Sequence, residues 1–207
     1  MRTTWEHAGA EGHEPLGHDG GMERTELARR LQEVCYLSGR FVLRSGQVTD
    51  FYFDKYMFES DPQLLRAVAE LAIPLVPTGT EVLAGLELGG VPLSTALSYA
   101  TGLPQVLVRK QAKTYGTAKL AEGPDVGGRR LLVIEDVVTT GGQVVASTND
   151  LRDRGAFVNE VLCAIDRRPQ QKPDAEAPAG AGKLEEAGLE LLPLFTAAEL
   201  TATARPA

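Results

Sequence analysis

The sequence predicts an α/β fold with a central, mostly parallel sheet flanked by helices. The run Leu-Leu-Val-Ile at residues 131–134 lacks polar alternation, as expected of a strand buried on both faces. Strand patterns also alternate with helical patterns along the chain. The strand patterns lie near residues 82, 105, 131 and 158, and the helical patterns lie near residues 92 and 142. This alternation is typical of parallel strands joined by helices, and 207 residues suit one domain.

The N-terminal elements follow from apolar spacing and from capping residues. A helix is predicted at residues 25–37, followed by an aromatic hairpin within residues 41–58 around a Ser-Gly turn. Asp61 and Pro62 are typical of a helix cap and first turn, so a helix is predicted from there through residue 71.

The later elements follow from glycine and proline positions. Gly89 and Gly90 predict a turn after the strand at residue 82, and Pro92 predicts the first turn of a helix. The helix that begins near residue 142 is predicted to end before Gly155. Residues 167–188 are rich in Pro, Ala and Gly, which predicts a surface excursion before a last strand and a short C-terminal helix.

Residues 1–21 predict a disordered tail, and residues 22–207 predict the folded domain. The tail holds several glycines, scattered acids and three histidines, but no apolar core of a secretory signal. The irregular spacing of His7, His13 and His18 favours a solvated linker over a metal site. We therefore expect a cytoplasmic protein.

Composition excludes several function classes. A net charge of −7 disfavours nonspecific nucleic-acid binding. No stretch approaches the roughly 18 consecutive apolar residues that a membrane helix needs. The two cysteines, Cys35 and Cys163, each lie in an apolar element, which predicts buried free thiols rather than a disulfide.

The strongest chemical signal lies at residues 131–142. The apolar strand delivers Glu135 and Asp136 to the carboxyl edge of the sheet, where α/β proteins bind ligands. The Thr-Thr-Gly-Gly run at 139–142 then supplies hydroxyl and backbone N–H donors before a helix, an arrangement that suits a phosphate. The carboxylates suit sugar hydroxyls or a nearby divalent cation. A phosphorylated sugar fits both halves, whereas the plain alternative is a strand ending in a solvated acidic turn.

A second signal is a cluster of three cations in a long loop. Arg109, Lys110 and Lys113 follow a short strand at residues 106–108, and no regular period appears again before Gly128. Alone, such a cluster is more often a solvated surface loop. A loop of about 20 residues without structure of its own is, however, usually functional and often a lid.

These motifs resemble those of a known family. Residues 131–142 resemble the phosphoribosyl pyrophosphate (PRPP) signature of type I phosphoribosyltransferases, and residues 109–116 resemble the Arg-Lys-x-x-Lys-x-His-Gly catalytic loop of orotate phosphoribosyltransferases. The resemblance implies the type I phosphoribosyltransferase fold, with a small N-terminal hood formed mainly by residues 22–60 with C-terminal elements. It implies transfer of phosphoribosyl from PRPP to orotate in pyrimidine synthesis.

The resemblance also implies site residues. Glu135 and Asp136 would contact the ribose hydroxyls, the loop after them would hold the 5′-phosphate, and Lys113 with Arg109 would stabilise the leaving pyrophosphate. The implied catalytic residues are Lys113, Arg109 and Asp136. The implied PRPP-binding residues are Arg109, Lys110, Lys113, Tyr115, Glu135, Asp136, Val137, Val138, Thr139, Thr140, Gly141, Gly142, Gln143, Gly89 and Gly90. The implied orotate-binding residues are Arg44, Tyr52, Phe53, Thr139 and Arg167.

Arg167 follows the last core strand, and its planar guanidinium suits the orotate carboxylate; a surface ion pair is the alternative.

Three positions depart from the family pattern. Gly89 stands where many members have Lys, with Lys55 a possible replacement, Tyr115 stands at a His position, and Gln143 stands at a position that is usually small or hydroxylated.

The resemblance further implies Mg²⁺, held by the substrate and reaching Glu135 and Asp136 through water, with no direct protein ligand. It implies a homodimer in which the catalytic loop closes over the neighbouring active site. Two other functions stay open: a phosphoribosyltransferase for a purine base, and a non-catalytic PRPP or nucleotide sensor of the same fold. No appended DNA-binding segment or basic face supports the sensor.

Overall fold

The computed structural model describes residues 21–42, 46–110, 120–169 and 182–203. Within these ranges a six-stranded sheet has the order β5-β4-β3-β6-β7-β8, and all of its neighbouring pairs are parallel except β4 with β5. Its strands are β3 (Val82–Leu86), β4 (Gln105–Val108), β5 (Ala121–Glu122), β6 (Arg130–Val138), β7 (Phe157–Asp166) and β8 (Glu190–Thr196). The predicted mostly parallel sheet is confirmed. The predicted tail lies outside the described residues, apart from its last residue.

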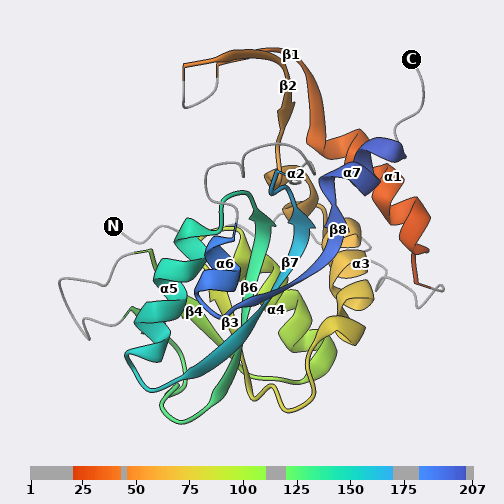
Figure 1. Ribbon diagram of the computed structural model, residues 1–207. Helices are drawn as coiled ribbons and strands as arrows, with labels where there is room; N and C mark the ends of the chain where they lie inside the picture. The colour runs from red at the N-terminus through yellow and green to blue at the C-terminus, as the bar shows by residue number, and fades with distance from the viewer. Residues whose placement is uncertain (1–20, 43–45, 111–119, 170–181, 204–207) are drawn as a thin grey trace, which may run out of the picture.

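Helices cover both faces of this sheet (Figure 1). The helices of the described ranges are α1 (Arg24–Cys35), α2 (Tyr56–Glu59), α3 (Pro62–Ala72), α4 (Gly90–Thr101), α5 (Gly142–Arg152), α6 (Lys183–Glu186) and α7 (Ala197–Ala202), with a 3-10 turn at Ile73–Leu75. α3 and α4 pack on one face, whereas α5 and α6 pack on the other.

Strand β6 shows why the apolar run lacks alternation. Leu132 and Ile134 join the apolar core that contains α3 and α4, whereas Leu131 and Val133 join the core that contains α5. Successive side chains of a strand point to opposite faces, so two buried faces require apolar residues at every position. The strand β6 is therefore buried on both faces, and its carboxyl end lies at the middle of the sheet edge.

The hairpin and the first helix differ slightly from their predicted bounds. β1 (Tyr36–Val42) pairs antiparallel with β2 (Val48–Phe53), which confirms the hairpin. Tyr36 already belongs to β1, so α1 ends two residues before the predicted end. Residues 56–58 lie in α2 rather than in a strand, because the Asp54 carboxylate accepts a hydrogen bond from the Tyr56 N–H at 3.1 Å and turns the chain into a helix.

Two short elements were missed in segments predicted to be irregular. β5 lies in the loop after β4, and α6 lies near the end of the predicted excursion at residues 167–188. Gly182, with φ 79°, turns the chain into α6, and Leu184 anchors that helix in the core. The predicted stop after α5 is confirmed, since Gly155 has φ 85° and donates its N–H to Arg152 O at 2.8 Å.

The strand order places a crevice at the centre of the sheet. From β3 the chain continues to β4 on one side, and then crosses to β6 on the other. The loops after β3 and β6 therefore diverge, which creates the switch point where open α/β sheets bind ligands. Gly89 and residues 139–141 lie in these two loops, and Gly90 and Gly142 begin the helices that follow them.

Other sequence predictions can be checked in the described ranges. Cys35 and Cys163 are both buried free thiols, as predicted, and burial raises the pKa of the Cys35 thiol to about 12. Among the helices described, none has the length and apolar character needed to cross a bilayer.

The N-terminal cap of α3 provides a test of local stability. One Asp61 carboxylate oxygen accepts hydrogen bonds from the N–H groups of Gln63 at 2.8 Å and Leu64 at 3.1 Å. We expect Asp61→Ala to lower the free energy of unfolding by about 1 kcal/mol, because two helix donors lose their acceptor. Urea unfolding measures the change. Asp61→Asn keeps an acceptor and should retain most of the stability; equal losses for both variants would contradict the capping role.

Candidate active site

The loop after β3 and the end of β6 touch at the switch point. A Cβ atom on Gly89 would lie 1.6 Å from Asp136 Oδ2, and one on Gly90 would lie 2.2 Å from Ile134 O. A side chain at position 89 would displace the Asp136 carboxylate, and one at position 90 would displace the backbone of β6, so the glycines allow the close approach of the two segments. The lysine that the family pattern places at position 89 would displace Asp136.

The two acids predicted from the sequence lie deep at this contact. Asp136 is 0% exposed and Glu135 is 8% exposed. Asp136 Oδ2 lies 2.6 Å from Lys55 Nζ, while its Oδ1 accepts the Val137 N–H at 2.6 Å. Glu135 Oε1 accepts the Asp136 N–H at 3.2 Å. Lys55, which precedes α2, therefore reaches the acid pair directly.

A third carboxyl group, which the sequence analysis missed, belongs to this cluster. Glu59 of α2 is buried and lies close enough to Asp136 for each carboxyl group to shift the pKa of the other, and its Oε1 has no hydrogen-bond partner in the part of the chain described. Glu59 follows Lys55 by four residues, the spacing that places two side chains on one face of a helical turn. That signal was hidden because residues 56–58 were predicted to be extended.

Burial and pairing set the charge of the cluster. Burial, reinforced by Asp136, raises the pKa of Glu59 to about 9 and raises the pKa of Glu135 well above its ordinary value. Burial also acts to raise the pKa of Asp136, but hydrogen bonds from Glu135, Glu59 and Lys55 outweigh it and hold that pKa below its ordinary value. These shifts favour the protonated forms of Glu59 and Glu135 and the ionised form of Asp136, which faces the Lys55 ammonium.

These pKa shifts bear on how a phosphate could bind beside two acidic residues. Two ionised carboxylates beside a phosphate would repel it, whereas a compensated pair adds no net negative charge. The protonated carboxyl groups can in addition donate hydrogen bonds, which ionised carboxylates cannot. The arrangement is therefore compatible with an anionic, hydroxylated ligand.

The loop after β6 has the form of an anion cradle. Gly141, with φ 71°, is the N-cap of α5, and its carbonyl oxygen accepts the first helical hydrogen bond from the Val145 N–H at 2.9 Å. Earlier N–H groups of the turn have no helical carbonyl to pair with, so they suit an anion. Thr139 and Thr140 are exposed beside them. Gln143 instead donates from its amide to Ser147 Oγ at 3.2 Å, along its own helix.

Part of the cationic loop lies beside the glycine turn. Arg109 Nε lies 3.4 Å from Glu122 Oε1 of β5, and the Lys110 N–H donates to Glu87 Oε2 at 3.0 Å. Glu87 precedes Gly89, so the end of β4 is tied to the turn after β3. The predicted pyrophosphate residues Lys113 and Tyr115 lie outside the described residues.

The predicted base-binding residues come from two separate elements. The Arg167 guanidinium lies 4.9 Å from the centroid of the Phe53 ring, which makes an edge contact with Tyr36 at 5.0 Å. Tyr52 packs its ring 5.5 Å from that of Phe41. Arg167 is exposed and makes no ion pair with any other described residue, so nothing there supports the surface ion-pair alternative. Arg44 lies outside the described residues.

A magnesium ion fits this site only if the substrate supplies its main ligands. No group of three or more His, Cys, Asp or Glu side chains within the described ranges is arranged to hold a metal. The ionised carboxylate, Asp136, is already paired with Lys55. Contact through water is therefore the arrangement that these residues fit.

Comparisons with known proteins agree on one family. The phosphoribosyl transferase domain matches residues 56–183, more than half of the chain. An orotate phosphoribosyltransferase from Nocardioides is 55% identical over 176 residues, which cover 85% of this chain and 93% of that protein.

Solved structures give the same result. The orotate phosphoribosyltransferase of Mycobacterium tuberculosis in complex with Fe(III) dicitrate is 31% identical, with a TM-score of 0.72, over 86% of this chain and 98% of that one. Its complex with PRPP is 28% identical, with a TM-score of 0.68, over the same shares of the two chains.

The raised pKa of Glu59 predicts a pH-dependent stability. An unfolded Glu ionises near pH 4.5, whereas folded Glu59 keeps its proton to about pH 9. The unfolded state therefore binds fewer protons between these values, and this group lowers stability as pH rises through that window. Glu59→Gln removes the titration, so its melting temperature should match that of the wild type near pH 5 and exceed it near pH 8.5. Thermal unfolding monitored by circular dichroism checks this; a pH-independent difference would contradict it.

Proposed function

We propose residue roles on the premise that the chain belongs to the orotate phosphoribosyltransferase family. It transfers the 5-phosphoribosyl group from PRPP to orotate, which yields orotidine 5′-phosphate and pyrophosphate in pyrimidine synthesis. The proposals below concern how the residues of this chain carry out that transfer.

The main support for these roles is the contact between the glycine turn after β3 and the acid cluster at the end of β6. PRPP carries phosphates at both ends of its ribose, so it must bind to both of these segments at once. We assign the ribose 2′ and 3′ hydroxyls to Glu135 and Asp136, and the 5′-phosphate to residues 137–143. The pyrophosphate would lie on Gly89 and Gly90, whose missing side chains leave backbone N–H groups accessible.

Lys55 is proposed to supply the cation that position 89 lacks. Its ammonium already lies 2.6 Å from an atom that would touch a Gly89 side chain. When ribose hydroxyls donate hydrogen bonds to the Asp136 carboxylate, they would replace part of its interaction with the Lys55 ammonium. Lys55 would then be able to pair with pyrophosphate oxygens, and the charge of the site would stay balanced.

The base side of the site is assigned to Arg167, Phe53, Tyr52, Thr139 and Arg44. The guanidinium of Arg167 matches the planar orotate carboxylate, and its position over Phe53 holds it at the edge of the hairpin. Orotate attacks the anomeric carbon through its ring nitrogen, so no covalent enzyme intermediate is needed. Binding would thus align the nucleophile with the ribosyl carbon.

Departure of pyrophosphate is assigned to Lys113 and Arg109, with Lys110 and Tyr115 as further phosphate donors. Cations aimed at the leaving group stabilise the charge that develops in a transition state of oxocarbenium character. Magnesium, when bound, would neutralise pyrophosphate charge. Arg109 directly follows β4, and Lys110 is the described residue closest in sequence to Lys113.

We further propose a cytoplasmic homodimer in which each catalytic loop serves the neighbouring site. The support is the resemblance of residues 109–116 to the shared loop of the family. We also propose that α1, α2 and the hairpin form the hood, together with α7, which packs against α1. Of the two other functions, a purine substrate and a non-catalytic sensor, neither is favoured by a particular observation.

The direct test mixes purified protein with orotate, PRPP and Mg²⁺ and follows loss of the orotate absorbance band. We expect turnover by the wild type, and we expect Lys113→Ala to lower kcat by about two to three orders of magnitude with little change in PRPP affinity. Asp125→Asn, an exposed loop change, is the control and should leave both constants unchanged. Equal losses of kcat and PRPP affinity in Lys113→Ala would reject its assignment to the leaving group.

The shared loop predicts complementation between two inactive variants. Lys113→Ala removes the loop cation of one subunit, and Asp136→Asn disables the ribose site of the other. Random reassortment should restore about a quarter of wild-type activity, because half of the dimers are mixed and each mixed dimer has one intact site. The measurement is activity after mixing and mild dissociation. Activity that stays at the level of the separate variants would contradict loop sharing.

A further inference from the structure

Lys183 lies beside the phosphate loop although it comes from a distant part of the chain. Its Nζ is 3.9 Å from the position that a Cβ on Gly142 would occupy, and Thr140 Oγ1 is equally far from that position. Gly142 begins α5, directly after the turn. An ammonium group thus faces the proposed 5′-phosphate site from a segment that the sequence analysis treated as a surface excursion.

The short helix that carries Lys183 is anchored at its centre. Leu184 is 1% exposed and belongs to the core beneath α5. Its Cδ2 and Cγ lie 3.0 Å from the position of a Cβ on Gly141, so α6 packs directly onto the glycine of the loop. The side chain next to Leu184 is therefore held near the loop rather than carried on a free segment.

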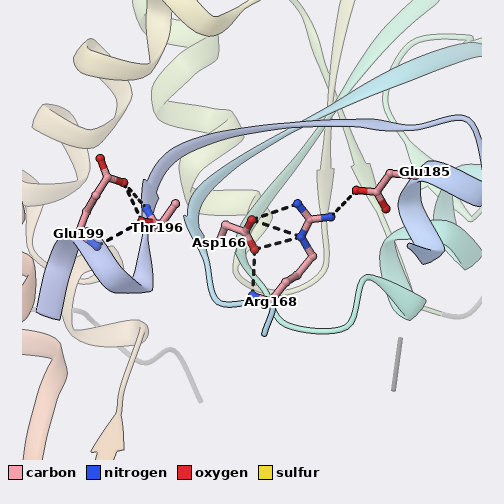
Figure 2. Close-up of polar contacts among 5 residues, drawn as sticks. All are labelled: Asp166, Arg168, Glu185, Thr196 and Glu199. Carbon is pink, nitrogen blue, oxygen red and sulfur yellow. Dashed lines mark hydrogen bonds and ion pairs between the residues drawn. The ribbon is translucent and has the colours of Figure 1, made fainter. Parts of the chain in front are cut away.

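Two arginines tie α6 to the sheet. Arg168 binds the Asp166 carboxylate at the end of β7 with its Nε and Nη2 at 3.1 Å, and Glu185 of α6 with its Nη1 at 2.8 Å, as Figure 2 shows. Arg152, at the end of α5, donates to Ala187 O at 2.8 Å. Together with the buried Leu184, these bonds hold the C-terminal half of α6 in place, which limits where Lys183 can reach.

Lys183 itself has no counter-charge in the described part of the chain. Arg168 and Lys55 each form ion pairs, whereas no described carboxylate pairs with the Lys183 ammonium. An exposed cation beside unpaired N–H groups at the start of an eleven-residue helix creates a local positive potential. This potential complements a phosphate dianion.

We propose that Lys183 is a further substrate-binding residue, which pairs with the 5′-phosphate of PRPP and of orotidine 5′-phosphate. This inference rests on the proposed function, because it requires that residues 137–143 hold that phosphate. Lys183 adds a point charge to a loop that otherwise offers only hydroxyl and backbone donors. Arg168 and Glu185 act through it as positioning residues, since they fix α6.

The test measures dissociation constants by isothermal titration with two probes, orotidine 5′-phosphate and pyrophosphate with Mg²⁺. Lys183→Met keeps the aliphatic stem and removes the charge. We expect it to weaken orotidine 5′-phosphate binding about five- to tenfold and to leave pyrophosphate binding within about twofold of the wild type. Lys183→Arg should restore most of the affinity. Arg154→Ala, which removes an exposed cation at the far end of α5, is the charge-matched control and should change neither constant.

Two results would overturn the assignment of Lys183: unchanged orotidine 5′-phosphate affinity in Lys183→Met, or equal losses for both probes. Failure of the proposed function looks different, since the wild type itself would then bind neither probe. Glu185→Gln supplies a second variant that keeps the ammonium but weakens the tether of α6. It should give a smaller loss, confined to orotidine 5′-phosphate; a loss larger than that of Lys183→Met would also count against the proposal.

Discussion

The contact between the glycine turn after β3 and the buried Asp136 is the constraint on which the site depends. The two loops diverge from neighbouring strands, and they meet only because Gly89 and Gly90 carry no side chains. The meeting places a fully buried carboxylate at the centre of the crevice, where an unpaired charge would be costly. Lys55 supplies the opposite charge at 2.6 Å. Backbone approach and charge compensation are therefore two parts of one arrangement.

The same arrangement links the small N-terminal elements to the sheet. Lys55 and Glu59 both come from the region of α2, yet they complete the environment of an acid at the end of β6. Burial raises the pKa values of Glu59 and Glu135 and so favours their protonated forms, which limits the negative charge of the cluster. An anionic substrate then meets donors and a compensated pair rather than a concentration of negative charge.

Much of this architecture could be predicted from the sequence, because it depends on local patterns. The buried strand β6, the cap of α3 and the Thr-Thr-Gly-Gly turn are each encoded by adjacent residues. Contacts over long sequence separations were harder to predict. Glu59 lies close to Asp136 although it comes from a helix much earlier in the chain, and Lys183 lies close to Gly142 although its segment has a composition typical of a loop. The sequence suggested Lys55 as a replacement for the lysine missing at position 89, but only the structure shows that it pairs with Asp136.

One carboxylate joins the two ends of the folded chain. Glu199 binds the backbone N–H and the hydroxyl of Thr196 through Oε2, as Figure 2 shows, while its Oε1 lies 3.0 Å from Arg24 of α1. Thr196 in turn pairs with Asp166, the residue before Arg167. The first helix, the last helix and the strand end that precedes Arg167, the proposed orotate-binding arginine, are thus linked by direct contacts. A protein fused at the C-terminal end, or a shortened last helix, would accordingly disturb the proposed nucleobase side of the crevice before the proposed phosphate side.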